Sequence, residues 1–334
     1  MRPWPTLAVA PMLDWTDRHC RFLHRLFGPE TLLYTEMVHV NAVLKGDRAR
    51  HLAHAPEEHP VALQLGGNEP EALAEACRVA EAWGFDEINL NVGCPSDRVQ
   101  AGAFGACLMA EPALVARCIE AMARATHRPV TVKCRLGITR PARDGAPALD
   151  LDHDDHLHGF VRGLVSAGVA GVIVHARKAV LGGLSPKDNR TIPPLQYERV
   201  YALKGAFPTL PVSLNGGLGT VDACEAALAQ CDGVMIGRAA YHDPCLLGAL
   251  HERFSPQQAA APTLSSVIAA YAAYAEEQFR AGVPLPVLTR PLLGLVQGRP
   301  GARRFRRLLS EDARHPEANP GLLTEALALV QEAA

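Results

Sequence analysis

Cys94 offers the clearest chemistry in the sequence, because its neighbours would fix a thiol just past a buried strand. The apolar run at 88–92 predicts the strand, which stops at Gly93-Cys94-Pro95. Pro95 favours extended backbone at Cys94, and Gly93 permits a sharp bend. A thiol with a pKa of about 8.5 is mostly protonated at neutral pH yet can release its proton. Asn91 stands a few residues before it as a hydrogen-bonding group.

Other polar or flexible side chains also follow predicted strands. They are Met12, Gln64, Asn91, Lys133, His175, Asn215 and Arg238. Each has a structural explanation on its own: His175 could be a hydrogen-bonded core histidine, and Lys133 could extend its ammonium group to water. These explanations weaken if all of the strands end at one opening, because the side chains would then share one site.

Two glycine turns suggest a phosphate site. Asn215-Gly216-Gly217 and Gly237-Arg238 each lie between a predicted strand and a helix. Glycine lets backbone N–H groups approach an anion, a helix N-terminus favours negative charge, and Arg238 can add a charged contact. The alternative is that these are ordinary turn glycines. A cofactor phosphate here would place its ring near Lys133, His175 and Gln64.

Eight short apolar strands alternate with helical segments over about 245 residues. The expected strands are 6–9, 31–34, 61–65, 88–92, 130–134, 171–174, 211–214 and 233–236. Their number and spacing predict a (β/α)8 barrel, the TIM-barrel form of the α/β class, spanning residues 1–254, with the active site at the carboxyl ends of the strands. A doubly wound sheet is the alternative, but no G-x-G-x-x-G follows the first strand. Residues 140–150 are expected to be a polar insertion.

Residues 255–334 have a different pattern. A Pro-, Ala- and Gln-rich linker at 255–263 precedes expected helices at 265–281, 303–309 and 320–334. This predicts a small all-helical domain carrying five arginines without an intervening acid. They are Arg299, Arg303, Arg304, Arg306 and Arg307. Such a cluster is a basic patch or a solvated helix face.

Composition excludes several classes of protein. The formal net charge is -2, and no apolar run is long enough to span a membrane. Because no secretory signal pattern precedes Met12, we expect a cytoplasmic protein. The nine cysteines form no C-x-x-C pair, so no zinc, iron–sulfur or disulfide framework is indicated. His153, His156 and His158 are interpreted as a polar loop entering a helix, and no metal is expected.

The sequence resembles the tRNA-dihydrouridine synthases, flavoproteins that reduce uridines in tRNA. The matching segments, in the family's order, are Ala10-Pro11-Met12-Leu13, Gln64-Leu65-Gly66, Asn91-Val92-Gly93-Cys94-Pro95-Ser96, Val132-Lys133-Cys134-Arg135, His175-Ala176-Arg177, Asn215-Gly216-Gly217 and Ile236-Gly237-Arg238. The segments 101–109 and 183–190 are similar to the bacterial A-type subfamily, whose targets are uridines 20 and 20a of the D-loop.

The resemblance implies FMN as cofactor and NADPH as the reductant. It implies FMN contacts from Pro11, Met12, Leu13, Gln64, Lys133, His175, Asn215, Gly216, Gly217, Gly237 and Arg238. A hydride would pass from flavin N5 to uracil C6, and Cys94 would donate a proton to C5. Asn91 would hold the uracil edge, while Lys133 and Arg177 would stabilise negative charge as it develops.

The resemblance also implies tRNA as the partner, with a target base that must be splayed out of the folded RNA. The expected tRNA contacts are Asn91, Arg177, Lys178, Lys187, Arg190, Arg299 and Arg303, and a monomer is expected. Two alternatives remain. One is a flavin barrel acting on a free pyrimidine, like the dihydroorotate dehydrogenases, which would not need the arginine-rich helical domain. The other is an RNA-binding protein on a catalytically dead barrel, which would not need Cys94.

Overall fold

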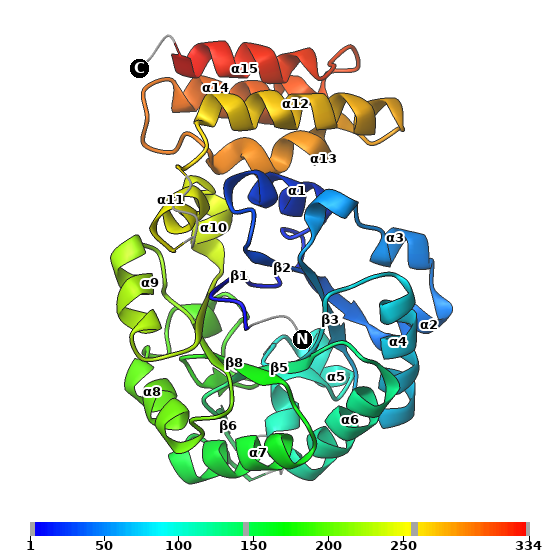
Figure 1. The fold of residues 1–334 in the computed structure, drawn as a ribbon, viewed down its shortest axis with the longest axis vertical. Helices are drawn as coiled ribbons and strands as arrows, with labels where there is room; N and C mark the ends of the chain where they lie inside the picture. The colour runs from blue at the N-terminus through cyan, green and yellow to red at the C-terminus, as the bar shows by residue number, and fades with distance from the viewer. Residues whose placement is uncertain (1–3, 143–146, 255–259, 332–334) are drawn as a thin grey trace.

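Eight parallel strands form a closed barrel in this computed structural model, which describes residues 4–142, 147–254 and 260–331 (Figure 1). Around the barrel the strands are β1 (Leu7–Val9), β11 (Gly233–Ile236), β10 (Val212–Asn215), β8 (Gly171–His175), β5 (Val130–Arg135), β4 (Glu87–Val92), β3 (Val61–Gly66) and β2 (Leu32–His39). Each strand pairs in parallel with its neighbours. The predicted TIM barrel is therefore confirmed.

Helices surround the barrel. They are α1 (Arg18–Phe27), α2 (Val40–Lys45), α3 (Arg48–Leu52), α4 (Pro70–Ala82), α5 (Asp97–Ala101), α6 (Pro112–Ala125), α7 (Asp154–Ser166), α8 (Tyr197–Ala206), α9 (Val221–Leu228), α10 (Arg238–His242) and α11 (Cys245–Phe254). Local sequence fixes where several of these helices begin. At the start of α1, Asp17 accepts a 2.9 Å hydrogen bond from the Cys20 N–H. Pro70 and Pro112 occupy the first helical positions of α4 and α6.

Side chains along each strand alternate between the barrel interior and the helix layer. The helix-facing side chains belong to the main core, as Val9, Leu63 and Val172 do. A separate apolar cluster contains Ala8, Ala10, Leu32, Tyr34, Ala62, Ile173 and Met235. Buried polar side chains, among them Gln64 and Asn89, occupy alternate positions of β3 and β4. The interior is therefore a mixed apolar and polar core.

Trp4 packs at the amino-terminal end of this barrel core. Its indole Nε1–H donates to Ser213 Oγ at 2.9 Å. A Cβ at Gly171 would lie 2.2 Å from the indole ring, and one at Gly233 would lie 3.0 Å from its nitrogen. Glycine is therefore required at both positions to leave room for the indole.

Two sequence predictions about strands need correction. The expected strand at 31–34 continues to His39, with a register shift between Tyr34 and Met37 that lets it go on pairing with β3. The insertion at 140–150 contributes to a small sheet of β6 (Ile138–Arg140), β7 (Leu149–Asp150) and β9 (Ala179–Val180). Its partner strand β9 comes from a distant loop, so local sequence could not reveal it. Residues 143–146 of the insertion lie outside the described residues.

The C-terminal region is helical, as expected, and packs beside α1 (Figure 1). Its elements are α12 (Leu264–Arg280), α13 (Leu285–Thr289), η4 (Arg290–Gly294), α14 (Ala302–Ser310), η5 (Asp312–Arg314) and α15 (Gly321–Gln331). Phe22 of α1 stacks on Tyr274 with ring centroids 3.8 Å apart, and Arg290 forms a 2.6 Å ion pair with Asp17. Trp15 in the loop after β1 stacks on Tyr241 of α10 at 4.4 Å.

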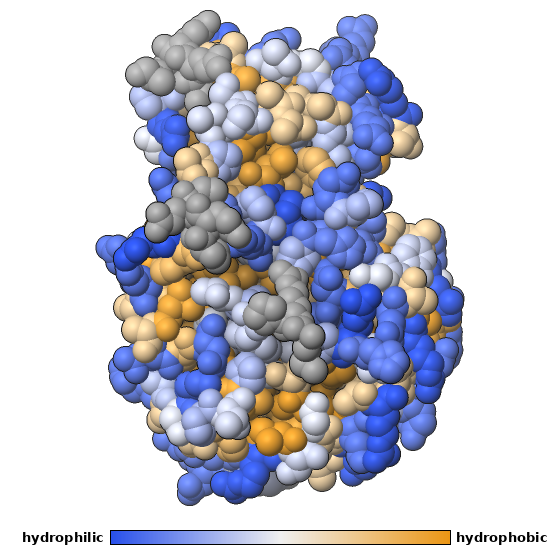
Figure 2. Space-filling model, viewed as in Figure 1, coloured by the Kyte–Doolittle hydropathy of each residue, from blue (hydrophilic) through white to orange (hydrophobic). Residues whose placement is uncertain are grey.

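The surface toward the viewer in Figure 2 is mainly hydrophilic, with smaller apolar patches between the helices. Among the described residues no helix has the length and apolar character needed to cross a membrane. The expected linker at 255–263 lies partly outside the described residues, and the domain boundary at 254/255 stays a prediction.

Candidate active site

The half-buried Cys94 is held by backbone contacts on both sides of its thiol. Asn91 Oδ1 accepts the N–H groups of Gly93 and Cys94 at 3.1 and 3.0 Å. The Cys94 carbonyl accepts from Ala106 at 2.9 Å. Gly105 has φ +75, and a Cβ there would lie 2.7 Å from the same carbonyl oxygen. The predicted strand-end cysteine is therefore fixed in place, with its Sγ 3.6 Å from Ser96 Oγ.

Strand pairing brings Asn91 next to two other predicted site residues. Its Nδ2 donates to Gln64 Oε1 on β3 at 2.8 Å. On the opposite side Asn91 is in register with Lys133 of β5. Gln64, Asn91 and Lys133 therefore form adjacent positions on three neighbouring strands, one of which leads directly to Cys94.

Lys133 and Arg135 place positive charge at the carboxyl end of β5, beside His175 at the end of β8. Burial, then repulsion from Arg135, lowers the pKa of Lys133 to about 8. Burial also lowers the pKa of Arg135 to about 10 and that of His175 well below 6.5, the latter helped by Arg135 and Lys133. His175 is therefore a neutral imidazole at pH 7, between cations that favour an anion in their midst.

Three further arginines extend this charge on the loops after β8 and β11. Arg238 Nη2 donates to the Arg190 carbonyl at 3.1 Å. Partial burial, and then the charge of Arg238, lowers the pKa of Arg190, while the pKa of Arg177 falls chiefly through burial. Within the part of the chain that the structure describes, no carboxylate forms an ion pair with these arginines, Lys133 or Arg135. We call Lys133, Arg135, Arg177, Arg190 and Arg238, together with the neutral His175 between them, the mouth cations.

Several donors among the mouth cations have no protein acceptor. His175 Nδ1 and Arg177 Nε are buried without a hydrogen-bond partner among the described residues. The Lys133 ammonium group likewise forms no hydrogen bond or ion pair with the residues that the structure describes. Burying such donors costs free energy unless a ligand supplies acceptors. This arrangement fits an anionic group rich in oxygen and nitrogen acceptors, such as a flavin mononucleotide.

The glycine turn after β10 approaches His175 closely. Gly216 and Gly217 have φ +112 and +71, and a Cβ at Gly216 would lie 3.2 Å from His175 Nε2. Tyr197 Oη donates to the Gly216 carbonyl at 2.6 Å, fixing the turn. The Asn215 amide donates to the Met235 carbonyl at 2.7 Å, so its Nδ2 ties β10 to β11. A Cβ placed at Gly237 would lie 3.9 Å from the side chains of Ala10 and Met12, at ordinary van der Waals distance.

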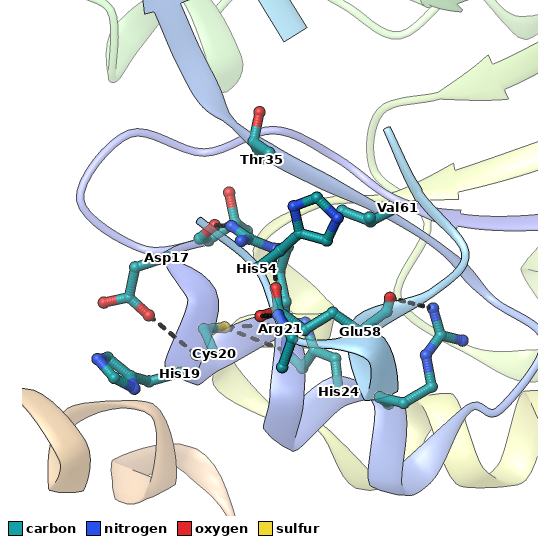
Figure 3. A network of polar contacts seen from close by, with 12 residues as sticks. Asp17, His19, Cys20, Arg21, His24, Thr35, His54, Glu58 and Val61 are labelled. Atoms are coloured by element: carbon teal, nitrogen blue, oxygen red, sulfur yellow. Dashed lines mark hydrogen bonds and ion pairs between the residues drawn. The ribbon is translucent and has the colours of Figure 1, made fainter. Parts of the chain in front are cut away.

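The loop after β1 carries Pro11, Met12 and Leu13. Thr16 Oγ1 accepts the Met12 N–H at 3.0 Å, while Leu13 is 65% exposed. Below it, Arg21 donates to the Thr16 carbonyl at 2.8 Å and forms a 2.7 Å ion pair with the fully buried Glu58 (Figure 3). The loop that was predicted to contact the cofactor is therefore supported from α1.

The remaining predicted tRNA contacts fall into two groups. Near the mouth, Lys178 is 3.2 Å from Asp152, so its charge is partly neutralised, whereas Lys187 is exposed. Arg299 and Arg303 are exposed in the C-terminal helical region, apart from the barrel strands (Figure 1). The structure brings the cofactor candidates together but leaves these arginines on a separate surface.

The predicted polar loop near residue 153 leads into α7. His153 Nδ1 accepts the His156 N–H, and His156 Nε2 contacts the Met109 carbonyl at 2.8 Å. Among the described residues, no group of three or more metal-ligating side chains that could hold an ion is found.

Sequence reasoning missed several residues that shape the site. They are Glu87, Asn89, Thr131, Arg135 and Tyr197. The spacing of Glu87, Asn89 and Asn91 is a usable signal, because alternate positions of a barrel strand face the interior together. Tyr197 offers no such signal, since its contact with Gly216 depends on tertiary structure.

Comparison with known proteins gives a consistent assignment. The family described as dihydrouridine synthase (Dus) matches residues 8–333. The tRNA-dihydrouridine(20/20a) synthase of Xanthomonas axonopodis pv. citri is 55% identical over 327 residues, covering 96% of this chain and 92% of that protein. The proteins of the same name from Escherichia coli K12 and Synechocystis sp. are each 50% identical, covering 97% and 96% of this chain and 91% and 93% of theirs. The chain belongs to the dihydrouridine synthase family.

Proposed function

We propose that this protein reduces the C5–C6 double bond of a uridine in the tRNA D-loop, at position 20 or 20a, using FMN and NADPH. The observation that carries the proposal is the placement of the Cys94 thiol, held by Asn91, just past the end of the strand that pairs with the strand of Lys133. Relatives that are 50–55% identical to it over the aligned residues are named for this reaction. Enzymes of this family are generally flavin-dependent.

The mouth cations and the glycine turns would hold FMN. The residues proposed for it are Pro11, Met12, Leu13, Gln64, Lys133, His175, Asn215, Gly216, Gly217, Gly237 and Arg238. Neutral His175 can donate one N–H to an acceptor, and Lys133 can stabilise negative charge. Backbone N–H groups of the two glycine turns, together with Arg238, suit a phosphate.

FMN, when bound and reduced by NADPH, would supply the hydride for uracil C6. The electron pair of the C5–C6 bond then bonds C5 to the proton that Cys94 donates, so the product is dihydrouracil and a cysteine thiolate that regains its proton from water. This role requires a protonated thiol at neutral pH. Asn91, which fixes the Cys94 backbone, would also hold the uracil edge.

The substrate must be splayed out of the folded tRNA to reach the mouth, at a cost of a few kcal/mol. Phosphate contacts offset this cost without reading sequence. Arg177, Lys178, Lys187 and Arg190 would make these contacts at the mouth, and Arg299 and Arg303 on the helical region of residues 255–334. We also propose that the protein acts as a monomer, and a tRNA substrate supports a cytoplasmic site of action.

The test is mass mapping of tRNA that lacks dihydrouridine, after incubation with the protein and NADPH. We expect a gain of two hydrogens at a single D-loop uridine. Cys94→Ala should retain FMN and tRNA binding but lose roughly 100-fold or more of the reduction rate. No gain from flavin-loaded protein on otherwise natively modified tRNA would refute the proposal and favour a free pyrimidine as the substrate.

A further inference from the structure

A continuous series of hydrogen bonds runs from Cys94 into the centre of the barrel. Asn91 Nδ2 donates to Gln64 Oε1 at 2.8 Å, and Gln64 Nε2 donates to Asn89 Oδ1 at 2.8 Å. Asn89 Nδ2 donates to Thr131 Oγ1 at 2.8 Å, and Thr131 Oγ1 donates to Glu87 Oε1 at 2.6 Å. We call Asn91, Gln64, Asn89, Thr131 and Glu87 the amide relay; it connects the mouth with a buried carboxylate at the start of β4.

Every hydrogen bond in the amide relay points the same way. Each member donates to the next one toward Glu87, and the relay begins with the N–H groups of Gly93 and Cys94 donating to Asn91 Oδ1. Hydrogen bonds arranged in one direction polarise and strengthen one another, most of all in a buried site. The relay is buried throughout, since none of its five side chains is more than 8% exposed.

The carboxylate of Glu87 explains this direction. An ionised carboxylate only accepts hydrogen bonds, so Thr131 must donate to it and must therefore receive a hydrogen from Asn89. That contact turns the Asn89 carbonyl toward Gln64, which in turn directs the Gln64 carbonyl at Asn91. A side-chain amide can otherwise be rotated to exchange its oxygen and nitrogen, so Glu87 removes an ambiguity from both mouth amides.

Tyr34 contacts Glu87 from outside the relay. Its phenol donates to the same Oε1 that Thr131 reaches. Burial, followed by the charge of Glu87, raises the pKa of Tyr34 well above 10, so the phenol keeps its proton and remains a donor. Tyr34 helps to neutralise the buried charge but does not lie between Glu87 and the mouth.

Stability alone does not account for the relay. Interiors of such barrels are usually filled with branched apolar side chains. A network of buried polar groups is costly when any member lacks its partner. Here the polar members occupy successive interior positions of β4 and end at Asn91, which fixes the Cys94 backbone.

We propose that Glu87 is a positioning residue, whose carboxylate fixes through Thr131 and Asn89 the orientation of the Gln64 and Asn91 amides and thereby the place of Cys94. This inference rests on the proposed function and deepens it. It assigns Glu87, Asn89 and Thr131 a role in uridine reduction although none of them reaches the mouth. Reversal of the relay would present oxygen where the mouth now presents N–H, and would remove the acceptor that holds the Cys94 N–H.

The first test compares Thr131→Val with Thr131→Ser and Tyr34→Phe. Valine has the size of threonine but breaks the relay, and we expect kcat for tRNA reduction to fall about 10- to 100-fold because Cys94 is misplaced. The KM for tRNA should stay unchanged, since phosphate contacts elsewhere set it. Serine keeps the hydroxyl and should restore kcat to within about threefold of the wild type.

Tyr34→Phe is the matched control for stability. It removes a buried hydrogen bond to the same carboxylate oxygen and should lower the midpoint of thermal unfolding, as Thr131→Val does, while leaving kcat nearly unchanged. Glu87→Gln, which is isosteric but can donate, should resemble Thr131→Val in kcat. Equal losses of kcat in Tyr34→Phe and Thr131→Val would overturn the proposal, because a loss that follows stability needs no relay.

A second measurement does not depend on turnover. Side-chain amide signals of Gln64 and Asn91, observed by nitrogen-15 NMR and assigned from Gln64→Glu and Asn91→Asp, should shift in Thr131→Val and Glu87→Gln but not in Tyr34→Phe. Unshifted signals in Thr131→Val would refute the relay even in an active enzyme. If the wild-type protein formed no dihydrouridine, the proposed function would fail, while the same NMR comparison would still decide whether Glu87 orients the mouth amides.

Discussion

Two arginine-rich regions of the molecule differ in whether protein groups compensate their positive charges. Beneath the loop after β1, Arg21 pairs with Glu58 (Figure 3). Nearby, Arg25 donates to the carbonyls of Gly28, Pro29, Glu58 and Pro60. At the barrel mouth, Lys133 and Arg177 have no such partners among the described residues. Both regions hold cations at least partly out of water, but only the first supplies a carboxylate to compensate for it.

The difference separates a structural use of charge from a functional one. A buried cation whose partners are all from the protein holds elements together, as Arg21 joins α1 to the segment before β3. A buried cation without a partner raises the free energy of the ligand-free protein and lowers its own pKa, as Lys133 does. An anionic ligand recovers that free energy when it binds, so uncompensated charge marks the binding site.

The largest effect on stability should come from Arg21→Met. It leaves the Glu58 carboxylate buried without its ion pair, and we expect unfolding free energy to fall by about 3–5 kcal/mol. Chemical denaturation measures this. The double variant Arg21→Met, Glu58→Leu should regain most of this lost stability. If Arg21→Met alone were as stable as the wild type, the Arg21–Glu58 ion pair would not have the structural role that separates this region from the mouth.

Lys133→Met should weaken FMN binding without lowering the stability of the FMN-free protein. It removes an uncompensated cation, so the FMN-free protein should be at least as stable as the wild type. FMN affinity should fall about 10- to 100-fold, the range for losing a hydrogen bond to a charged group. Equilibrium titration by flavin fluorescence gives the affinity. Destabilisation similar to that of Arg21→Met would show that Lys133 has a protein partner after all.

The pH dependence of FMN binding should report Lys133 directly. In the FMN-free protein its pKa is about 8, against 10.5 in the unfolded chain, so its unfavourable effect on stability is complete below pH 8 and disappears between pH 8 and 10.5. Bound FMN favours the charged form, so binding above pH 8 takes up a proton. The Kd should then rise by up to about tenfold per pH unit above pH 8. The same rise in Lys133→Met would assign the proton to another group.

The smallest effect should come from the exposed arginines of α14. Reversing the charge of Arg303 and Arg304 should weaken tRNA binding and reduce the slope of log affinity against log salt by roughly 0.7–0.9 for each phosphate that these side chains neutralise. Reversing Arg124 on α6, which is also exposed, provides a matched control. An unchanged slope in the α14 variant would place the tRNA path on another surface.

The barrel and the mouth were predictable because their signals are local. Short apolar strands, glycine turns and a proline-fixed cysteine each reveal themselves within a few residues, and the parallel barrel then gathers the strand ends. The amide relay was not predicted, because Glu87 and Asn89 alternate with Ile88 and Leu90 as they would in a strand with one face in water. Only closure of the barrel turns that polar face inward.

Interactions between distant segments also escaped prediction. Arg21 and Glu58 are 37 residues apart, and nothing near either residue specifies the other. The pairing of β6 with β9 and the stacking of Trp15 on Tyr241 likewise depend on loops that meet only in the folded chain. These are the interactions that support the site rather than form it.

The stacking of Trp15 on Tyr241 also provides an optical reporter. The chain has three tryptophans, at three separate places: Trp4 in the barrel interior, Trp15 between the loop after β1 and α10, and Trp83 at the end of α4. Replacing Trp4 and Trp83 by phenylalanine would leave Trp15 as the sole indole emitter. Its fluorescence would then follow, in real time, whether the loop beside the mouth and the junction with the helical region respond when FMN or tRNA arrives.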